Sequence, residues 1–126
     1  MRQGVTISNI DVFRTYLERF SGGDVAGAAE LLDDDFTFDG PILQSTGKAD
    51  FLAGSQAAAQ MARGCEIHRQ WADGDEVCSV YDFRMETPAG VASIPMAEWS
   101  VIRDGKLFSS RLIFDTGAMA ALMPAG

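Results

Sequence analysis

Basic residues are scarce in this chain. Ten lysines and arginines stand against eighteen aspartates and glutamates, which gives a formal net charge of −8. Proteins that bind nucleic acids or anionic membranes need a cluster of positive charge that displaces the counterions of the phosphates. No such cluster occurs here, so the sequence predicts neither a nucleic-acid nor a membrane partner.

Long apolar runs are also missing, and no segment approaches the roughly 20 residues that span a bilayer. The first four residues, 1–4, contain no apolar signal core, so a cytoplasmic protein is expected. The only thiol and imidazole groups of the sequence belong to Cys65, Cys78 and His68. The two cysteines flank a predicted turn at 73–75 and fall several residues apart along the ladder, so we expect no disulfide, no zinc site and no cofactor.

What the chain does contain is an ordinary globular composition, with 47% hydrophobic and 22% charged residues over 126 positions. One domain covering residues 1–126 is expected. Apolar residues at i, i+3, i+4 and i+7 predict a first helix over 10–20, and Asp24 caps a second helix over 25–32. A third helix is expected over 49–62. The acidic run 33–35 is interpreted as a solvated turn.

The rest of the chain predicts strands. A short strand, 36–39, ends at Gly40-Pro41, and four longer strands over 65–72, 77–87, 91–103 and 107–115 are separated by glycine-containing turns. Helices followed by a mostly antiparallel sheet indicate an α+β fold. The tail, 116–126, is expected to form a short closing helix, a dimer contact or a partly disordered end.

Carboxyl groups on strands that face an apolar interior are candidates for chemistry, because burial raises a carboxyl pKa into a useful range. Alternation along 91–103 puts Glu98 on the same side as Met96 and Ser100. The opposite side, which includes Trp99, is also largely apolar, and this favours a homodimer formed through the sheet. The candidates considered are Asp39, Asp82, Glu98, Asp115 and Tyr16.

Two further side chains have a structural and a functional interpretation. His68 is expected mid-strand and is more often a hydrogen-bonded residue than a catalyst. Arg111 is expected to pair with Asp82 or Glu98 across strands.

Several motifs, in this order, make the chain resemble the SnoaL-like members of the nuclear transport factor 2-like superfamily. They are Tyr16 with Phe20-Ser-Gly-Gly-Asp24, Leu31-Leu32-Asp-Asp-Asp-Phe36, Phe38-Asp39-Gly40-Pro41, Gly47-Lys48-Ala49-Asp50-Phe51, the segment from Trp99 to Lys106, and Phe114-Asp115. The resemblance implies a cone-shaped α+β barrel in which three N-terminal helices pack on a strongly curved sheet. It also implies a dimer and an internal pocket for a small apolar ligand.

The resemblance extends to ketosteroid isomerase, whose logic is an aspartate base with a tyrosine and a protonated acid in the oxyanion hole. By that resemblance Tyr16 and Glu98 match the oxyanion-hole pair. Asp39 falls one position before the base, and the matching position is Gly40. The acid that SnoaL cyclases carry in the last strand is replaced here, at Arg111-Leu112.

Two functions follow as expectations. The first is an isomerase or cyclase that transfers a proton next to a carbonyl of a ketone or polyketide-like substrate, with Asp39, Tyr16 and Glu98 catalytic. The second is a binding or accessory module that uses the same pocket without turnover. An epoxide hydrolase-like site with Arg84 or Arg111 ranks last. The remaining residues expected to contact the ligand are Phe20, Phe38, Met96, Ser100 and Asp115. The alternative role of Asp115 is to cap the C-terminal tail.

Overall fold

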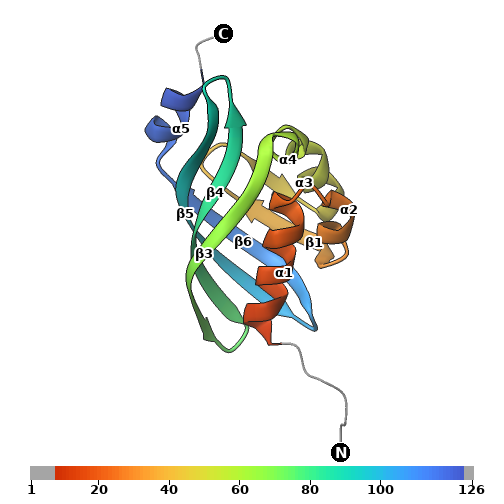
Figure 1. Cartoon of the computed structure of the whole chain (residues 1–126). Helices are drawn as coiled ribbons and strands as arrows, with labels where there is room; N and C mark the ends of the chain where they lie inside the picture. Colours follow the sequence, from red (N-terminus) through yellow and green to blue (C-terminus); the bar gives the residue numbers. More distant parts are fainter. Residues whose placement is uncertain (1–7, 124–126) are drawn as a thin grey trace, which may run out of the picture.

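The computed structural model describes residues 8–123, in which helices cover one face of a strongly curved sheet (Figure 1). Its elements are α1 (Asn9–Ser21), α2 (Val25–Ala29), β1 (Leu32–Asp39), β2 (Gln44–Thr46), α3 (Lys48–Gly54), α4 (Gln56–Met61), β3 (Ala62–Asp73), β4 (Glu76–Thr87), β5 (Gly90–Arg103), β6 (Lys106–Phe114) and α5 (Thr116–Leu122). The predicted α+β class is confirmed. None of the helices in this part of the chain is long and apolar enough to cross a membrane.

The six strands form one open sheet in the order β2-β1-β6-β5-β4-β3. All neighbours are antiparallel except β1 and β6, which run parallel. The β4–β5 pair is held in register along its whole length, from Glu76 opposite Val101 to Thr87 opposite Gly90. Because alternate residues of a strand face opposite sides, this register determines which side chains meet over the inner face.

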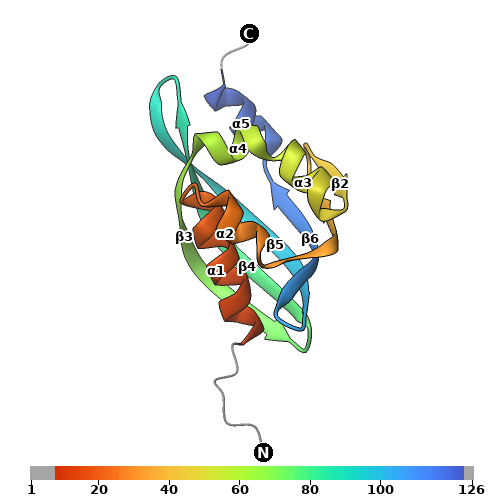
Figure 2. The ribbon, with the colours of Figure 1, turned by 90° about the vertical axis from the view of Figure 1, so that its right-hand side faces the viewer.

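The first helix forms as its periodicity predicts. The side chain of Ser8 caps it by accepting a hydrogen bond from the backbone N–H of Asp11, and Gly22 ends it. Its apolar face, with Phe13 fully buried and Tyr16 and Leu17 nearly so, packs on the inner face of the sheet (Figure 2). Burial of large aromatic side chains contributes the most to a core of this kind.

Three local expectations were wrong. The acidic run 33–35 belongs to β1, where an irregular register between Leu32 and Thr37 leaves these side chains largely in solvent while the strand continues. The short strand β2 was missed. The expected third helix is two helices, α3 and α4, that meet at Ser55. A Cβ atom at Gly54 would lie 2.8 Å from the end of the Leu43 side chain, so α3 passes close to the β1–β2 loop at this point.

The tail forms α5 as far as Leu122, and residues 124–126 lie outside the described part. Asp115 caps this helix by accepting hydrogen bonds from the backbone N–H groups of Gly117 and Ala118. The capping role predicted for Asp115 is therefore confirmed. Cys65 and Cys78 are both free, also as expected.

Candidate functional site

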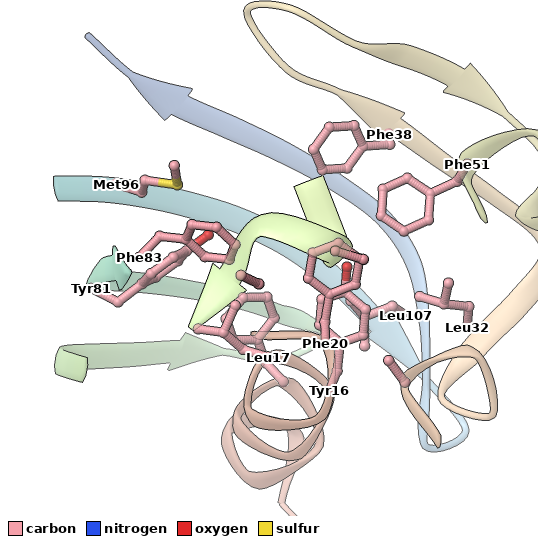
Figure 3. Close-up of a cluster of buried hydrophobic side chains, with 14 of the residues drawn as sticks. Tyr16, Leu17, Phe20, Leu32, Phe38, Phe51, Tyr81, Phe83, Met96 and Leu107 are labelled. Atoms are coloured by element: carbon pink, nitrogen blue, oxygen red, sulfur yellow. The ribbon is translucent and has the colours of Figure 1, made fainter. Parts of the chain in front are cut away.

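A cavity of about 370 Å³ lies between the helices and the inner face of the sheet. This volume is at the lower end of the range of about 300–1,000 Å³ that is typical of small-molecule pockets. Aromatic side chains from α1, β1, α3 and β4 form much of its wall, among them Phe20, Phe38, Phe51 and Phe83 (Figure 3). The exposed lining residues Ile42, Ala57 and Ala58 place its mouth between the β1–β2 loop and α4.

Methionine is the second feature of this wall. Met61, Met85, Met96, Met119 and Met123 all line the cavity, which leaves only Met1 elsewhere in the sequence. Methionine side chains are unbranched and polarizable, so they adapt to ligands of different shape. The wall is therefore both apolar and adaptable.

Among residues 8–123, Glu98 is the only acidic residue that lines this cavity, and no lysine, arginine or histidine joins it there. Its side chain is 3% exposed. The strand register sets Glu98 opposite Ser79 on β4 and Leu112 on β6. Tyr81 and Ser110 are consequently its diagonal neighbours on the same face, at a distance that side chains of this size can bridge.

These neighbours hold both oxygens of the Glu98 carboxyl group. The Tyr81 hydroxyl donates to Oε1 at 2.7 Å, and the Ser110 hydroxyl donates to Oε2 at 2.6 Å. Ser100 lies behind Ser110, with 2.6 Å between the two hydroxyl oxygens. Burial raises the pKa of Glu98, while the hydrogen bonds from Ser110 and Tyr81 act to lower it, and the net shift is upward.

Tyr16 approaches the same group from α1. Burial raises its pKa well above the ordinary value, and the charge of Glu98 raises this pKa further. Among the described residues its hydroxyl makes no recorded hydrogen bond, whereas the Tyr81 hydroxyl is committed to Glu98. Tyr16 therefore has a free donor beside a carboxyl group, both in the wall of one cavity.

Asp39 lies elsewhere, although Tyr16 and Glu98 come together as the sequence suggests. Its carboxylate is exposed on the outer face of the sheet, where Arg111 donates to Oδ2 from Nη2 at 3.1 Å and from Nε at 3.3 Å. Asp39 and Arg111 are directly opposite each other in the β1–β6 pair. The pairing of Arg111 with Asp82 or Glu98 was therefore a wrong expectation.

Gly40 explains the direction of Asp39. Phe38 and Gly40 line the cavity, while Asp39 between them points outward by the ordinary alternation of a strand. The backbone N–H of Gly40 bonds the carbonyl of Leu43 at 2.8 Å, so the chain turns without a bulge that would bring Asp39 inside. The position that faces inward carries no side chain.

The expected ligand-contact residues divide in the same way. Phe20, Phe38 and Met96 line the cavity. Ser100 is completely buried behind Ser110 and supports the Glu98 cluster, and Asp115 is an exposed helix cap. His68 is half-exposed and lies 3.2 Å from Asp82, a residue that does not line the cavity.

Tyr81 and Ser110 were missed as site residues. The signal for Tyr81 was available, because the Pro88-Ala89 turn determines the β4–β5 register and puts Tyr81 opposite Met96 on the face of Glu98. The position of Ser110 is harder to predict, because the register between β5 and β6 shifts at Val101 and Ile102 of β5. Local sequence alone does not place it beside Glu98.

Sequence and structure comparisons agree with this geometry. The family model of the SnoaL-like domain matches residues 13–110. No curated protein matches the chain in sequence. Solved structures share the fold at low sequence identity, between 14% and 20% for three of them.

The first of these, from Catenulispora acidiphila, has a ketosteroid isomerase-like fold and was crystallised with trimethylamine. It is 16% identical in sequence, the alignment covers 90% of this chain and 94% of that one, and the TM-score is 0.79. TerC, co-crystallised with polyporic acid, is 20% identical over 90% of this chain and 96% of its own, with a TM-score of 0.77. A protein from Shewanella denitrificans, provisionally assigned as a SnoaL-like polyketide cyclase, is 14% identical over 90% and 95%, with a TM-score of 0.74.

Proposed function

The chain belongs to the SnoaL-like domain family, and we propose that it binds a small, mainly apolar molecule in the cavity, with one polar group of that molecule at Tyr16 and Glu98. The observation that carries this proposal is an apolar cavity of about 370 Å³ whose single acidic side chain is held on both oxygens by hydroxyl donors. A few placed polar groups in an apolar wall are what fixes the orientation of a small ligand.

The related structures support a small-molecule ligand in general terms. One was crystallised with trimethylamine and another with polyporic acid. These two compounds differ greatly in size and charge, so they support the use of the fold for small molecules and do not select a ligand for this chain.

Methionine methyl groups provide the test of binding. In protein labelled with ¹³C at the methionine methyls, a neutral apolar probe such as tert-butylbenzene should shift the signals of cavity residues such as Met96 and leave Met1 unchanged. Ala58→Trp would place a large side chain at the mouth and should weaken these shifts, whereas Ala53→Trp, on an exposed position of α3 outside the cavity, should not. Shifts that are equal in both variants would show binding elsewhere.

A second candidate function is proton transfer next to a carbonyl, of the isomerase or cyclase kind, without a cofactor. Two observations favour it: the raised pKa of Glu98 and the free hydroxyl of Tyr16 beside it. A carboxylate with a raised pKa is a stronger base than an ordinary one. Glu98 would take a proton from the carbon next to the carbonyl, the electron pair would move to the carbonyl oxygen, and the Tyr16 hydroxyl would donate a hydrogen bond to that oxygen.

This chemistry can be tested before the substrate is known. Small ketones such as 4-phenyl-2-butanone exchange the protons next to the carbonyl for deuterium in D₂O, and NMR follows the rate. The protein should accelerate this exchange, Glu98→Gln should abolish the acceleration, and Tyr16→Phe should reduce it. Exchange at the uncatalysed rate in the wild-type protein, across a series of ketones that bind, would leave binding alone as the function.

A further inference from the structure

The surroundings of Glu98 also indicate the charge of the ligand. We propose that the cavity takes a compact organic cation, a tertiary or quaternary ammonium group with apolar substituents, whose positive charge faces Glu98. This inference rests on the proposed binding function and narrows it to one class of ligand.

The first argument is the hydrogen-bond balance of the Glu98 cluster, which consists of Glu98, Tyr81, Ser110 and Ser100. With Glu98 ionised, Tyr81 donates to one oxygen, Ser110 donates to the other, and Ser100 can donate to Ser110. Every hydroxyl proton of this cluster then has an acceptor. The ionised form is therefore the one that the cluster satisfies completely.

Within the cluster, the protonated form leaves a proton unplaced. If Glu98 donates to Tyr81, the Tyr81 proton must turn away, and no other acceptor for it is recorded among residues 8–123. If Glu98 donates to Ser110, the proton of Ser110 passes to Ser100, whose own proton then lacks a recorded acceptor in a fully buried position. A buried hydroxyl proton without an acceptor costs free energy.

An ionised Glu98 then lacks a counter-ion. Within residues 8–123 no basic side chain lines the cavity, and Glu98 is 3% exposed, so bulk water does little to stabilise its charge. A buried charge without a partner is strongly unfavourable. A positively charged ligand would supply the missing partner at the point where the protein has none.

The walls suit such a ligand as well. Phe20, Phe83, Tyr16 and Tyr81 line the cavity together with Glu98. Aromatic faces attract organic cations, and the attraction is stronger where water is excluded. Besides Glu98, the hydroxyl groups of Tyr16 and Ser55 line the cavity without a hydrogen-bond partner among residues 8–123. A primary ammonium group would exchange strong hydration for these few acceptors. Alkyl substituents on the nitrogen avoid that loss.

Glu98 is the group that determines how ligand binding depends on pH. Tyr16 from α1 and Tyr81 from β4 both have raised pKa values, as does Cys65 on β3, whose charge would act on Tyr81. These three groups therefore stay neutral further into the alkaline range than usual. Ser100 and Ser110 from β5 and β6 do not titrate. Binding of a permanent cation should strengthen as pH rises through the pKa of Glu98, and binding of a neutral ligand should not.

Phenyltrimethylammonium and tert-butylbenzene form a matched pair of probes, because they share one shape and differ by one charge. Affinities are measured from the methionine methyl shifts at a pH well above the pKa of Glu98. We expect the wild-type protein to bind the cation at least tenfold more tightly than the neutral probe. In Glu98→Gln this preference should disappear. In Asp39→Asn, which removes one exposed negative charge from the outer face, it should persist.

Other outcomes separate the two proposals. Equal or tighter binding of tert-butylbenzene by the wild-type protein contradicts the cation proposal and leaves the binding function intact. Loss of the preference in Asp39→Asn as well would assign it to the general negative charge of the surface. If neither probe moves the cavity methyl signals, both proposals are wrong. Should Glu98→Gln fail to fold, the pH dependence of the two probes in the wild-type protein decides the question.

Discussion

The Tyr81 hydroxyl donates a 2.7 Å hydrogen bond to Oε1 of Glu98, and both side chains are buried on the inner face of the sheet. This bond joins two adjacent strands through their side chains and holds a carboxyl group in an apolar cavity. Stability, titration and the proposed ligand binding are therefore coupled at one group. Substitutions at Glu98 and its neighbours can separate these effects.

Stability should fall with rising pH because of Glu98. Its pKa is raised in the folded protein above the ordinary value of 4.5, so in the interval between the two the folded state binds more protons than the unfolded state. The contribution of this group is then fully present below its ordinary pKa and is lost as pH rises through the folded pKa. Urea unfolding as a function of pH measures this slope.

Glu98→Gln is the variant that isolates the slope. It removes the titrating group and nearly preserves the shape of the side chain, so the difference in unfolding free energy between wild type and variant should change with pH. The other acids contribute equally to both proteins and cancel. A difference that stays constant across the interval would contradict the upward shift.

The two tyrosines of the site should respond differently to loss of their hydroxyl groups. Tyr81→Phe leaves Glu98 without one of its donors, and we expect a loss of about 1–3 kcal/mol in unfolding free energy. Tyr16→Phe removes a hydroxyl without a recorded partner in the described part of the chain, so stability should change little. Equal losses in the two variants would mean that Tyr16 has a structural bond of its own.

Asp39 should be dispensable for the site. Its partner Arg111 and Asp39 itself are 59% and 57% exposed. Exposed ion pairs of this kind contribute up to about 1 kcal/mol after screening by solvent. Asp39→Asn should therefore leave ligand affinity unchanged, and ketone exchange too if it occurs, and should lower stability only slightly. A large loss of either function would return Asp39 to the role that the sequence first suggested.

Asp39 and Glu98 also show how far the sequence could predict this site. The α+β class, the antiparallel succession of the last four strands and the position of Glu98 on the same side as Met96 follow from periodicity and turns. The direction of Asp39 depends on a single residue of register beside Gly40, where one step exchanges the two faces of a strand. The donors Tyr81 and Ser110 come from neighbouring strands, and a local pattern does not show such cross-strand contacts.

The outer face of the sheet should bind a second copy of the chain. Trp71, Cys78 and Trp99 lie directly opposite one another across β3, β4 and β5 on this face, and both tryptophans are 49% exposed. Ile113, on the neighbouring strand, is 56% exposed. Apolar side chains gathered on one side of a sheet are typical of an interface. We expect a homodimer in light scattering after size exclusion.

Trp99→Lys should convert this dimer into a monomer, since a charge would then lie in the middle of the interface. A matched control is Ile42→Lys, which replaces an apolar residue 66% exposed at the cavity mouth, away from the sheet face. A wild-type protein that is monomeric at high concentration contradicts the prediction. Dissociation by the control alone would place the interface at the mouth.

The cap of α5 should affect the cavity from a distance. Asp115 accepts hydrogen bonds from the N–H groups of Gly117 and Ala118, and this short helix contributes Met119 to the cavity wall. No side chain of α5 is fully buried, and Met119 and Leu122 pack against the core only in part, so the cap contributes to holding the helix in place. Asp115→Ala should weaken the helix by about 1 kcal/mol. The Met119 methyl signal should then narrow and move toward its position in an unfolded chain, and bound ligand should dissociate faster.

Asp115→Asn is the matched control for this cap. It keeps an acceptor at the same place, since asparagine caps helices as well as aspartate does. The control should therefore preserve both the Met119 signal and the rate of ligand dissociation, because the helix keeps its first-turn hydrogen bonds. If Asp115→Asn shows the same losses as Asp115→Ala, the charge of Asp115 matters and its cap does not.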